Sequence, residues 1–209
     1  MWKASATSTI GAHPLSLRCP ICRENGVFEN AGVQDVHLPQ AQPPVFLGIR
    51  RCPGTQCRAA VFVVHAGPGI IAAFPPSTID FDSTNIPASV VTAFEESIKC
   101  HANQCFTASA IMVRKTLEEL CRDRQATGTN LKERVRALGS KVVLPQELLD
   151  GLDDLRLLGN DAAHIESQEY NSVGKEEVEV AIEFAKEVLK AVYQYSTLLA
   201  RLRALKKTP

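Results

Sequence analysis

Two closely spaced pairs of cysteines limit what the first third of this chain can fold into. The motifs CPIC (residues 19–22) and CPGTQC (residues 52–57) each place two thiols within one turn that begins Cys-Pro. A tetrahedral Zn²⁺ takes four thiolates at about 2.3 Å, and two ligands from one turn can point the same way. The residues between the pairs are numerous enough to form a hairpin that brings the turns together. The sequence therefore predicts one zinc site, with the ligands Cys19, Cys22, Cys52 and Cys57.

Four thiolates close the coordination shell of zinc, so this ion would be structural rather than catalytic. A β-rich segment as short as residues 16–70 has little core of its own, and zinc would contribute on the order of 10 kcal/mol to its folding. The alternative is four unrelated buried cysteines, which rarely occur as two pairs beside Pro and Gly turns. His37 and His65 lack the spacing of ligands, and we expect both on the surface.

Cys100, His101 and Cys105 resemble a second set of metal ligands. On a helix, however, Cys100 and Cys105 would lie about 140° apart, which is too far to share an ion. We therefore expect Cys100, Cys105 and Cys121 to be small buried apolar residues.

The charge of the chain excludes a general attraction to nucleic acid or to an anionic membrane. Its 209 residues include 23 Lys and Arg and 23 Asp and Glu, so any contact with nucleic acid must be local. We find no apolar run of signal-peptide or transmembrane length. Together with cysteine spacing that suits metal thiolates, this indicates a cytoplasmic protein with no membrane partner.

The hydrophobic pattern changes from strand-like to helical near Pro87. Residues 16–70 contain β-favouring runs and many turn residues, which indicate short antiparallel strands. Residues 71–86 are rich in Pro, Ser and Thr, which is typical of a linker. The expected helices of the following bundle, residues 87–207, span residues 87–102, 104–124, 130–139, 145–164 and 175–206. The sequence thus predicts an α+β chain, a small N-terminal β-rich zinc ribbon followed by a five-helix bundle.

The last predicted helix carries one line of apolar side chains that we expect to face the core. This line consists of Val178, Ile182, Ala185, Leu189, Val192, Leu199 and Leu202.

The fourth predicted helix carries a polar stripe. At about 100° per residue, Asp153, Arg156, Asn160 and His164 fall within about 80° of one another. Leucines lie on one side of this stripe and aspartates on the other. Polar groups at the margin of a core-facing helix cost stability unless they are paired, so the stripe is either a hydrogen-bond network or a site.

In the structural interpretation of the stripe, Arg156 pairs with Asp153 or with Glu118, and Gly159 marks the close approach of another helix. Arg114 and Glu118 have the i,i+4 spacing of a helical ion pair. They either form a surface pair or face the stripe.

Several of these stretches together resemble a known family. FPP (residues 74–76), ASAIMVRKTLEELC (108–121), LRLLGNDAAH (155–164) and the cysteine-rich start are similar to the bacterial domain-of-unknown-function family forty-one forty-five. That family is allied with the HEPN helical bundles, so the resemblance, which covers roughly residues 16–200, implies an HEPN-like bundle that dimerises. It also implies occurrence beside restriction, toxin–antitoxin and phage-defence systems.

Active HEPN proteins are metal-independent ribonucleases in which an Arg and a His from two protomers act on one RNA phosphate. By this resemblance His164, Arg156 and Asn160 would be catalytic, with His164 moving protons and Arg156 stabilising the charge of the phosphorane. The intervening LLGNDAA is longer than the pattern allows, and Gly159 stands where an Arg is expected. Both departures weigh against ribonuclease activity.

Three functions remain open. The first is an accessory or regulatory protein of a bacterial defence, restriction or toxin–antitoxin system, a homodimer that binds RNA, DNA or a protein through its ribbon and bundle. The second is an HEPN-type endoribonuclease. The third is a nucleotide-sensing module in which the stripe, with Asp153, Arg114 and Glu118, binds a phosphate ligand.

Overall fold

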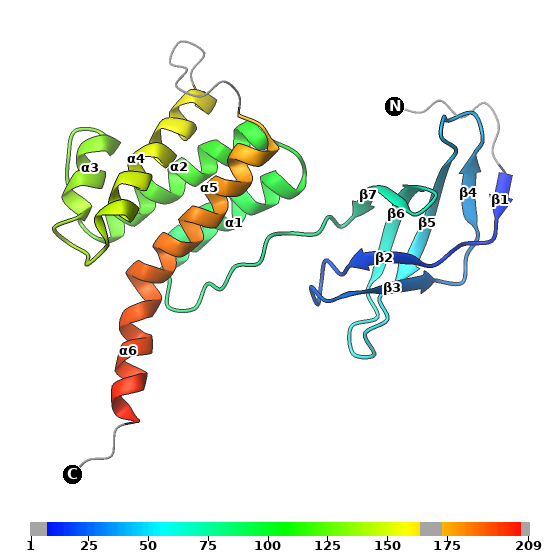
Figure 1. The fold of residues 1–209 in the computed structure, drawn as a ribbon, viewed down its shortest axis with the longest axis horizontal. Coiled ribbons are helices and arrows are strands. Elements are labelled where there is room, and N and C mark those ends of the chain that lie inside the picture. The colour runs from blue at the N-terminus through cyan, green and yellow to red at the C-terminus, as the bar shows by residue number, and fades with distance from the viewer. Residues whose placement is uncertain (1–7, 164–172, 206–209) are drawn as a thin grey trace. The chain divides into compact units, whose positions relative to one another are not determined.

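The chain divides into two compact units. The computed structural model describes residues 8–163 and 173–205. The first unit comprises residues 1–78 and the second residues 79–209, coloured blue to cyan and green to red in Figure 1. All described strands belong to the first unit and all described helices to the second.

The first unit is an antiparallel sheet of short strands. These are β1 (Ser8–Ile10), β2 (Leu15–Arg18), β3 (Asn25–Asn30), β4 (Asp35–Leu38), β5 (Val45–Arg51), β6 (Ala60–Ala66) and β7 (Gly69–Phe74). The β-favouring runs at 45–47 and 61–64 lie in β5 and β6, as the sequence predicts. Strand β7 also takes up residues 71–74, which the sequence places in a linker, because these residues pair with β6.

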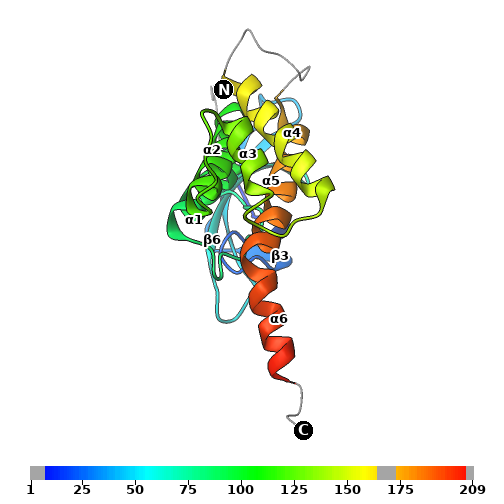
Figure 2. The same ribbon diagram turned by 90° about the vertical axis from the view of Figure 1, so that its left-hand side faces the viewer.

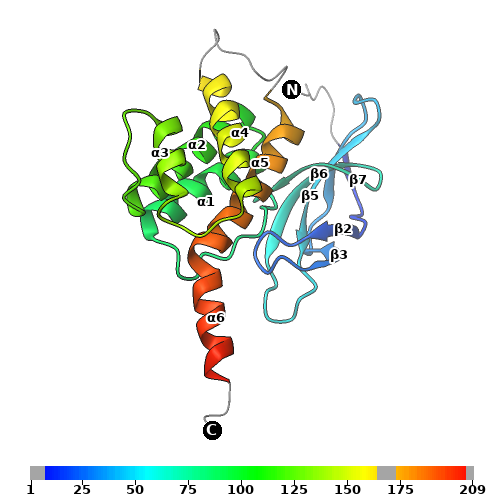
Figure 3. The same cartoon turned by 60° about the vertical axis from the view of Figure 1, so that its left-hand side comes forward.

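Strand β5 is the centre of this sheet. Along one edge it pairs with β6 from Phe46 to Arg51, and β6 in turn pairs with β7. Along the other edge it pairs first with β4 and then, at Arg50 and Arg51, with β3. Figure 3 shows β5 and β6 side by side, with the β2–β3 hairpin near their end. This hairpin therefore carries the first cysteine pair to the end of β5, where the second pair begins.

Side chains of β6 point alternately to the two faces of the sheet and contribute to a small apolar cluster on each face. Val61 and Val63 point to a cluster with Phe28 and two of the cysteines. Val64 points the opposite way, to a cluster with Leu38 and Val45. Each cluster contains few apolar side chains, so neither is large enough to account for a stable fold by itself.

The second unit contains five helical segments among its described residues, the last of them divided into three parts. The segments are α1 (Ala88–Ala102), α2 (Phe106–Asp123), α3 (Leu131–Leu138), α4 (Gln146–Ala163) and α5 (Lys175–Leu189), which continues as a π-helical turn, η1 (Lys190–Gln194), and α6 (Tyr195–Ala204). Figure 2 shows α3 beside α4 and α6 continuing the line of α5. An antiparallel sheet followed by five helical segments makes the chain α+β, which confirms the predicted fold class.

Local sequence fixes where these helices begin. The side chain of Asn130 accepts a hydrogen bond from the backbone N–H of Glu133 (3.0 Å), which caps α3. The Glu133 carboxylate in turn accepts a hydrogen bond from the backbone N–H of Thr129 (2.7 Å), the residue before the N-cap. Pro87 occupies the N-cap of α1 rather than its first turn.

One apolar core holds the helical unit together. Val90 and Phe94 of α1, Leu117 of α2, Leu152 of α4 and Ile182 of α5 are all at most 1% exposed. They belong to one continuous cluster of buried residues that reaches every helical segment up to Tyr193.

The predicted core line of the last helix is only partly correct. Val178, Ile182, Ala185 and Leu189 are buried, but Leu199 and Leu202 are 51% and 61% exposed. The apolar spacing is helical, as expected. The reason for the difference is that α6 extends beyond the neighbouring helices, so that no residue of α6 is buried.

Within residues 8–163 and 173–205, no helix has both the length and the apolar character needed to cross a membrane.

Candidate metal centre and polar networks

The four predicted ligands lie together in the sheet unit. The sulfurs of Cys19, Cys22, Cys52 and Cys57 are all within 4.8 Å of one another. Cys19 Sγ lies 3.7 Å from Cys57 Sγ, and Cys22 Sγ lies 3.7 Å from Cys52 Sγ. Four sulfurs at about 2.3 Å from a common centre would be about 3.8 Å apart. Two of the separations are close to this value and the others are no longer than 4.8 Å, so this cluster could hold a tetrahedral metal ion.

The two cysteine loops close in the same way. The N–H of Cys19 donates to the carbonyl of Glu24 (2.9 Å), and the N–H of Cys52 donates to the carbonyl of Ala59 (2.8 Å). In each loop the acceptor is the second residue after the second cysteine. Both cysteine pairs therefore lie in loops closed by an equivalent backbone hydrogen bond.

The residue directly after each cysteine pair is an arginine with a left-handed backbone. Arg23 has φ 65° and Arg58 has φ 50°, and both side chains are exposed. This conformation costs a non-glycine residue about 1 kcal/mol. Glycine or asparagine would adopt it more easily, so loop geometry alone does not explain an arginine at both positions.

Backbone donors favour the thiolate at Cys19. Burial raises the pKa of this thiol, but the N–H groups of Cys22 and Ile21, which point at its sulfur (3.5 and 3.4 Å), outweigh burial. The pKa falls to about 7. For Cys52 burial prevails and raises the pKa to about 12, so this thiol gives up its proton readily only to a metal, which deprotonates a coordinating thiol.

A buried ionic network, which the sequence analysis missed, lies beside the centre of the sheet. Arg50 of β5 donates to both oxygens of Asp35 of β4 (2.8 and 2.5 Å). His65 Nε2 of β6 lies 3.3 Å from Asp35 Oδ2, and its Nδ1 lies 2.8 Å from the carbonyl of Gly67. Arg50, Asp35 and His65 are at most 2% exposed. The expectation that His65 is a surface residue was therefore wrong.

This network keeps Asp35 ionised. Burial raises the pKa of the carboxyl, but hydrogen bonds from Arg50 and His65 outweigh that effect and lower it below its usual value. The sequence contains a signal for the burial of His65, because this residue follows Val61 and Val63 at the same two-residue spacing and so lies on the same face of β6. A polar residue in an inward register needs a buried partner.

The described part of the polar stripe on α4 is engaged in contacts with its own unit. Arg156 Nε donates to Asp153 Oδ1 (2.6 Å), which lowers the pKa of this carboxyl. The first of the two partners expected for Arg156 is thus correct. His164, the last residue of the stripe, lies outside the described residues. The arrangement of Arg156 and Asp153 is that of an intrahelical ion pair.

Helices α2 and α4 approach each other closely at Gly159. A Cβ at this position would overlap the Cβ of Arg114 and lie 3.1 Å from the carbonyl oxygen of Ala110. Arg114 crosses the contact, where its Nη1 donates to the carbonyl of Arg156 (3.2 Å). Its Nε is 3.6 Å from Glu118 Oε1. Gly159 therefore marks a close helix contact, as expected, and Arg114 faces the stripe.

The other cysteines form no metal cluster among the described residues. Cys121 is buried, and burial raises its pKa to about 11, which suits the expected inert core residue. Cys105 is exposed and Cys100 is half-buried. The expectation that Cys105 is buried was wrong, because this residue lies in the turn between α1 and α2.

A comparison with protein families identifies the helical unit. The family described as "Domain of unknown function (DUF4145)" matches residues 95–206, more than half of the chain. The chain belongs to this family. No curated protein and no solved structure is significantly similar to it. The match begins within α1, covers all later helices to the end of α6 and lies outside the cysteine cluster, so this cluster is a feature of this DUF4145 protein beyond its family domain.

Proposed function

We propose that this DUF4145 protein is a cytoplasmic, non-enzymatic nucleic-acid-binding protein whose sheet unit is built around a structural zinc ion. Its role would be that of an accessory component in a bacterial defence or regulatory system, as its family resemblance suggests. The observation that carries the proposal is the arginine repeated after each cysteine pair, Arg23 and Arg58.

The chemistry of the donor set supports zinc. Four thiolates at tetrahedral spacing are the ligands of structural zinc sites, and they leave no open position for a substrate. The metal would therefore hold the two loops, with Arg23 and Arg58, in a fixed relation. Its role would be to position a binding surface.

The charge of the sheet unit supports a polyanionic partner. The whole chain is neutral, but residues 1–78 contain an excess of basic side chains. The basic ones are Lys3, Arg18, Arg23, Arg50, Arg51 and Arg58, and the acidic ones are Glu24, Glu29 and Asp35. Asp35 and Arg50 neutralise each other in the interior, and the other charged side chains of the described part are four arginines and two glutamates, an excess of two positive charges. Strained backbone retained at two equivalent positions is typical of functional residues, and arginine recognises phosphate with its planar fork.

The polar stripe of α4 supports a structural role rather than catalysis. The side chain of Arg156 is 14% exposed and paired with Asp153, so a phosphate would have to displace that carboxylate. Cleavage of RNA by the purified protein that is lost in His164→Ala, with an unchanged melting temperature, would overturn the non-enzymatic assignment.

The test measures binding of the zinc-loaded protein to labelled single-stranded and duplex RNA and DNA of equal length by fluorescence anisotropy. We expect binding at low salt that weakens as salt rises. The double variant Arg23→Ala/Arg58→Ala should reduce the slope of log affinity against log salt by about 2, since each lost phosphate contact removes about 1.

A matched control carries Lys99→Ala and Lys141→Ala, which remove two exposed charges of the helical unit. It should retain the affinity and slope of the wild type. The proposal fails if the zinc-loaded protein binds none of these nucleic acids at low salt, or if the arginine variant binds as well as the wild type.

A further inference from the structure

Helix α6 presents an apolar stripe with no partner among the described residues. At about 100° per residue its large apolar side chains fall within about 120° of one another. These are Tyr195, Leu198, Leu199, Leu202 and Leu205, and they are 49% to 80% exposed. Arg201 and Arg203 lie on either side of the stripe. A contiguous apolar surface bordered by charge is typical of a protein–protein contact.

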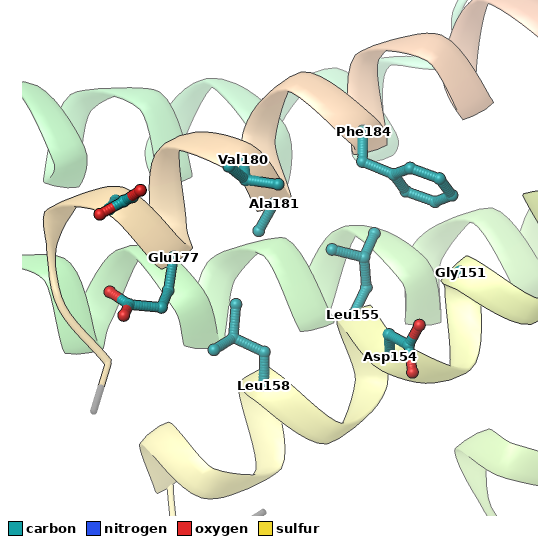
Figure 4. Close-up of a pocket in the computed structure, with 9 residues that line it drawn as sticks. Gly151, Asp154, Leu155, Leu158, Glu177, Val180, Ala181 and Phe184 are labelled. Carbon is teal, nitrogen blue, oxygen red and sulfur yellow. The ribbon is translucent and has the colours of Figure 1, made fainter. Parts of the chain in front are cut away.

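An apolar groove runs between α4 and α5 of the same unit. Its volume is about 480 Å³. Figure 4 shows Leu155 and Leu158 of α4 pointing toward Val180 and Ala181 of α5, with the ring of Phe184 beside Gly151. A Cβ at Gly151 would overlap this ring, so the glycine makes room for Phe184 at that end of the groove.

The groove is acidic where α6 is basic. Asp154 of α4 and Glu176 and Glu177 of α5 line it, whereas the charges that flank the α6 stripe are Arg201 and Arg203. An amphipathic helix is a typical occupant of an apolar groove. The charges of the two surfaces are also complementary, since α6 is basic and the groove is acidic.

The chain cannot place its own α6 in its own groove. Helix α5, the π-turn η1 and α6 form one continuous helical backbone, and the N–H of Tyr195 donates to the carbonyl of Lys190 across the junction. Val180 lines the groove, and the middle of α6 lies about 30 Å further along the same helix at 1.5 Å per residue. Because α6 continues in the direction of α5, as Figure 2 shows, it cannot turn back to contact the groove beside α5.

We infer that the groove between α4 and α5 receives α6 of a second copy of this chain. Two copies related by a two-fold axis would each insert α6 into the groove of the other. The same pair of surfaces is then buried twice, as in an isologous dimer. A stable interface needs roughly 800 Å² from each partner, and reciprocal use of helix and groove helps to reach that area.

The first test breaks the apolar part of the contact. We expect wild-type protein to have twice the mass of one chain in analytical ultracentrifugation. The variant Leu199→Asp/Leu202→Asp should have the mass of one chain. The control Ala200→Asp/Ala204→Asp adds the same charges to the opposite, exposed side of α6 and should leave the dimer intact.

The second test exchanges the charges and identifies the occupant of the groove. Variant A carries Arg201→Glu/Arg203→Glu, and variant B carries Asp154→Lys/Glu176→Lys. Each alone should be monomeric, because helix and groove then have the same sign. An equimolar mixture of A and B should dimerise, because both helix–groove contacts are again complementary.

The outcomes separate this arrangement from its alternatives. A wild-type protein that is monomeric across the micromolar range overturns the inference. A dimer of variant B alone also overturns it, because pairing of α6 with α6 would leave B unaffected. A helical circular dichroism spectrum equal to that of the wild type shows that each variant remains folded.

Discussion

The two units of this chain are stabilised in different ways. The helical unit has one large apolar core, in which Phe94, Leu117, Leu152 and many other side chains share the stabilisation. The sheet unit has two small apolar clusters and, in addition, four clustered thiols and one buried ionic network. We expect stabilisation to be distributed over many side chains in the helical unit and concentrated in these few polar groups in the sheet unit.

This difference predicts how strongly a single substitution should destabilise each unit. A distributed core loses a part of its stability with each substitution, because the remaining contacts persist. A concentrated network of charges or ligands fails as a whole when one member is removed, because the others are left buried and unpaired. Each unit should therefore respond to changes of its own kind.

Removal of the metal should have the largest effect. A chelator, or the variant Cys52→Ser, is expected to unfold the sheet unit, since a structural zinc contributes on the order of 10 kcal/mol. Hydrogen exchange should show loss of protection within residues 8–78. The helical circular dichroism signal should persist, because the core of the helical unit contains none of the four ligands.

Cys105→Ser is the matched control for this experiment, because Cys105 is an exposed thiol outside the cluster. It should retain the metal content and exchange pattern of the wild type. If the metal-free protein kept its strands protected, the concentrated stabilisation of the sheet unit would not be centred on the cysteines.

The variant Asp35→Asn should have the next largest effect. It leaves Arg50 buried without a counter-charge, which costs about 3–5 kcal/mol. The loss should appear in chemical denaturation monitored by exchange in β4, β5 and β6. The double variant Asp35→Leu/Arg50→Met removes both charges and should recover most of the loss. Equal stability of the single and double variants would mean that the pair is not coupled.

Acid should weaken the same network. The pKa of Asp35 is lower in the folded state than in the unfolded state, where it is about 3.8. The ionised carboxylate therefore contributes its full stabilisation at pH values above the unfolded-state pKa. This contribution is lost as the pH falls through the folded pKa. The double variant lacks the carboxylate, so the wild type should lose more stability than the double variant on acidification.

In the helical unit, Gly159→Ala should have an intermediate effect. Alanine raises helix propensity, but its Cβ overlaps Arg114 where α2 and α4 meet. We expect a net loss of about 1–3 kcal/mol from overpacking, measured as a lower denaturation midpoint of the helical signal. Asp150→Ala, on the exposed side of the same helix, should change it by only a few tenths of a kcal/mol. A raised midpoint in Gly159→Ala would show that the helices can move apart at little cost.

The sequence could predict those features whose geometry is encoded locally. The spacing of Cys19 and Cys22, and of Cys52 and Cys57, specifies loop turns that can share one metal. The helices follow from periodicity, and the start of α3 follows from Asn130. Gly159 could be recognised as a contact because glycine is unfavourable within a helix.

The remaining features depend on partners that are distant in sequence. Asp35, Arg50 and His65 come from three strands, and their meeting follows from the register between those strands rather than from any one segment. For α6, an apolar stripe has the same spacing whether it faces a core or a partner. Leu199 and Leu202 were placed in the core for that reason, and only the extent of the neighbouring helices shows that they are exposed.

The smallest effect should come from the ion pair between Asp153 and Arg156 on α4. Breaking this pair tests whether any polar contact of the helical unit contributes as much stability as the ionic network of the sheet unit. The side chain of Asp153 is 37% exposed, so solvent screens its attraction to Arg156, and Asp153→Asn should cost less than about 1 kcal/mol at neutral pH. Arg156 lowers the pKa of Asp153, so this stabilisation is present above the unfolded pKa and lost as the pH falls through the folded one. The difference between wild type and variant in chemical denaturation should accordingly vanish in acid. A loss as large as that of Asp35→Asn would mean that the helical unit also contains a concentrated polar network, and that the contrast between the two units is one of composition alone.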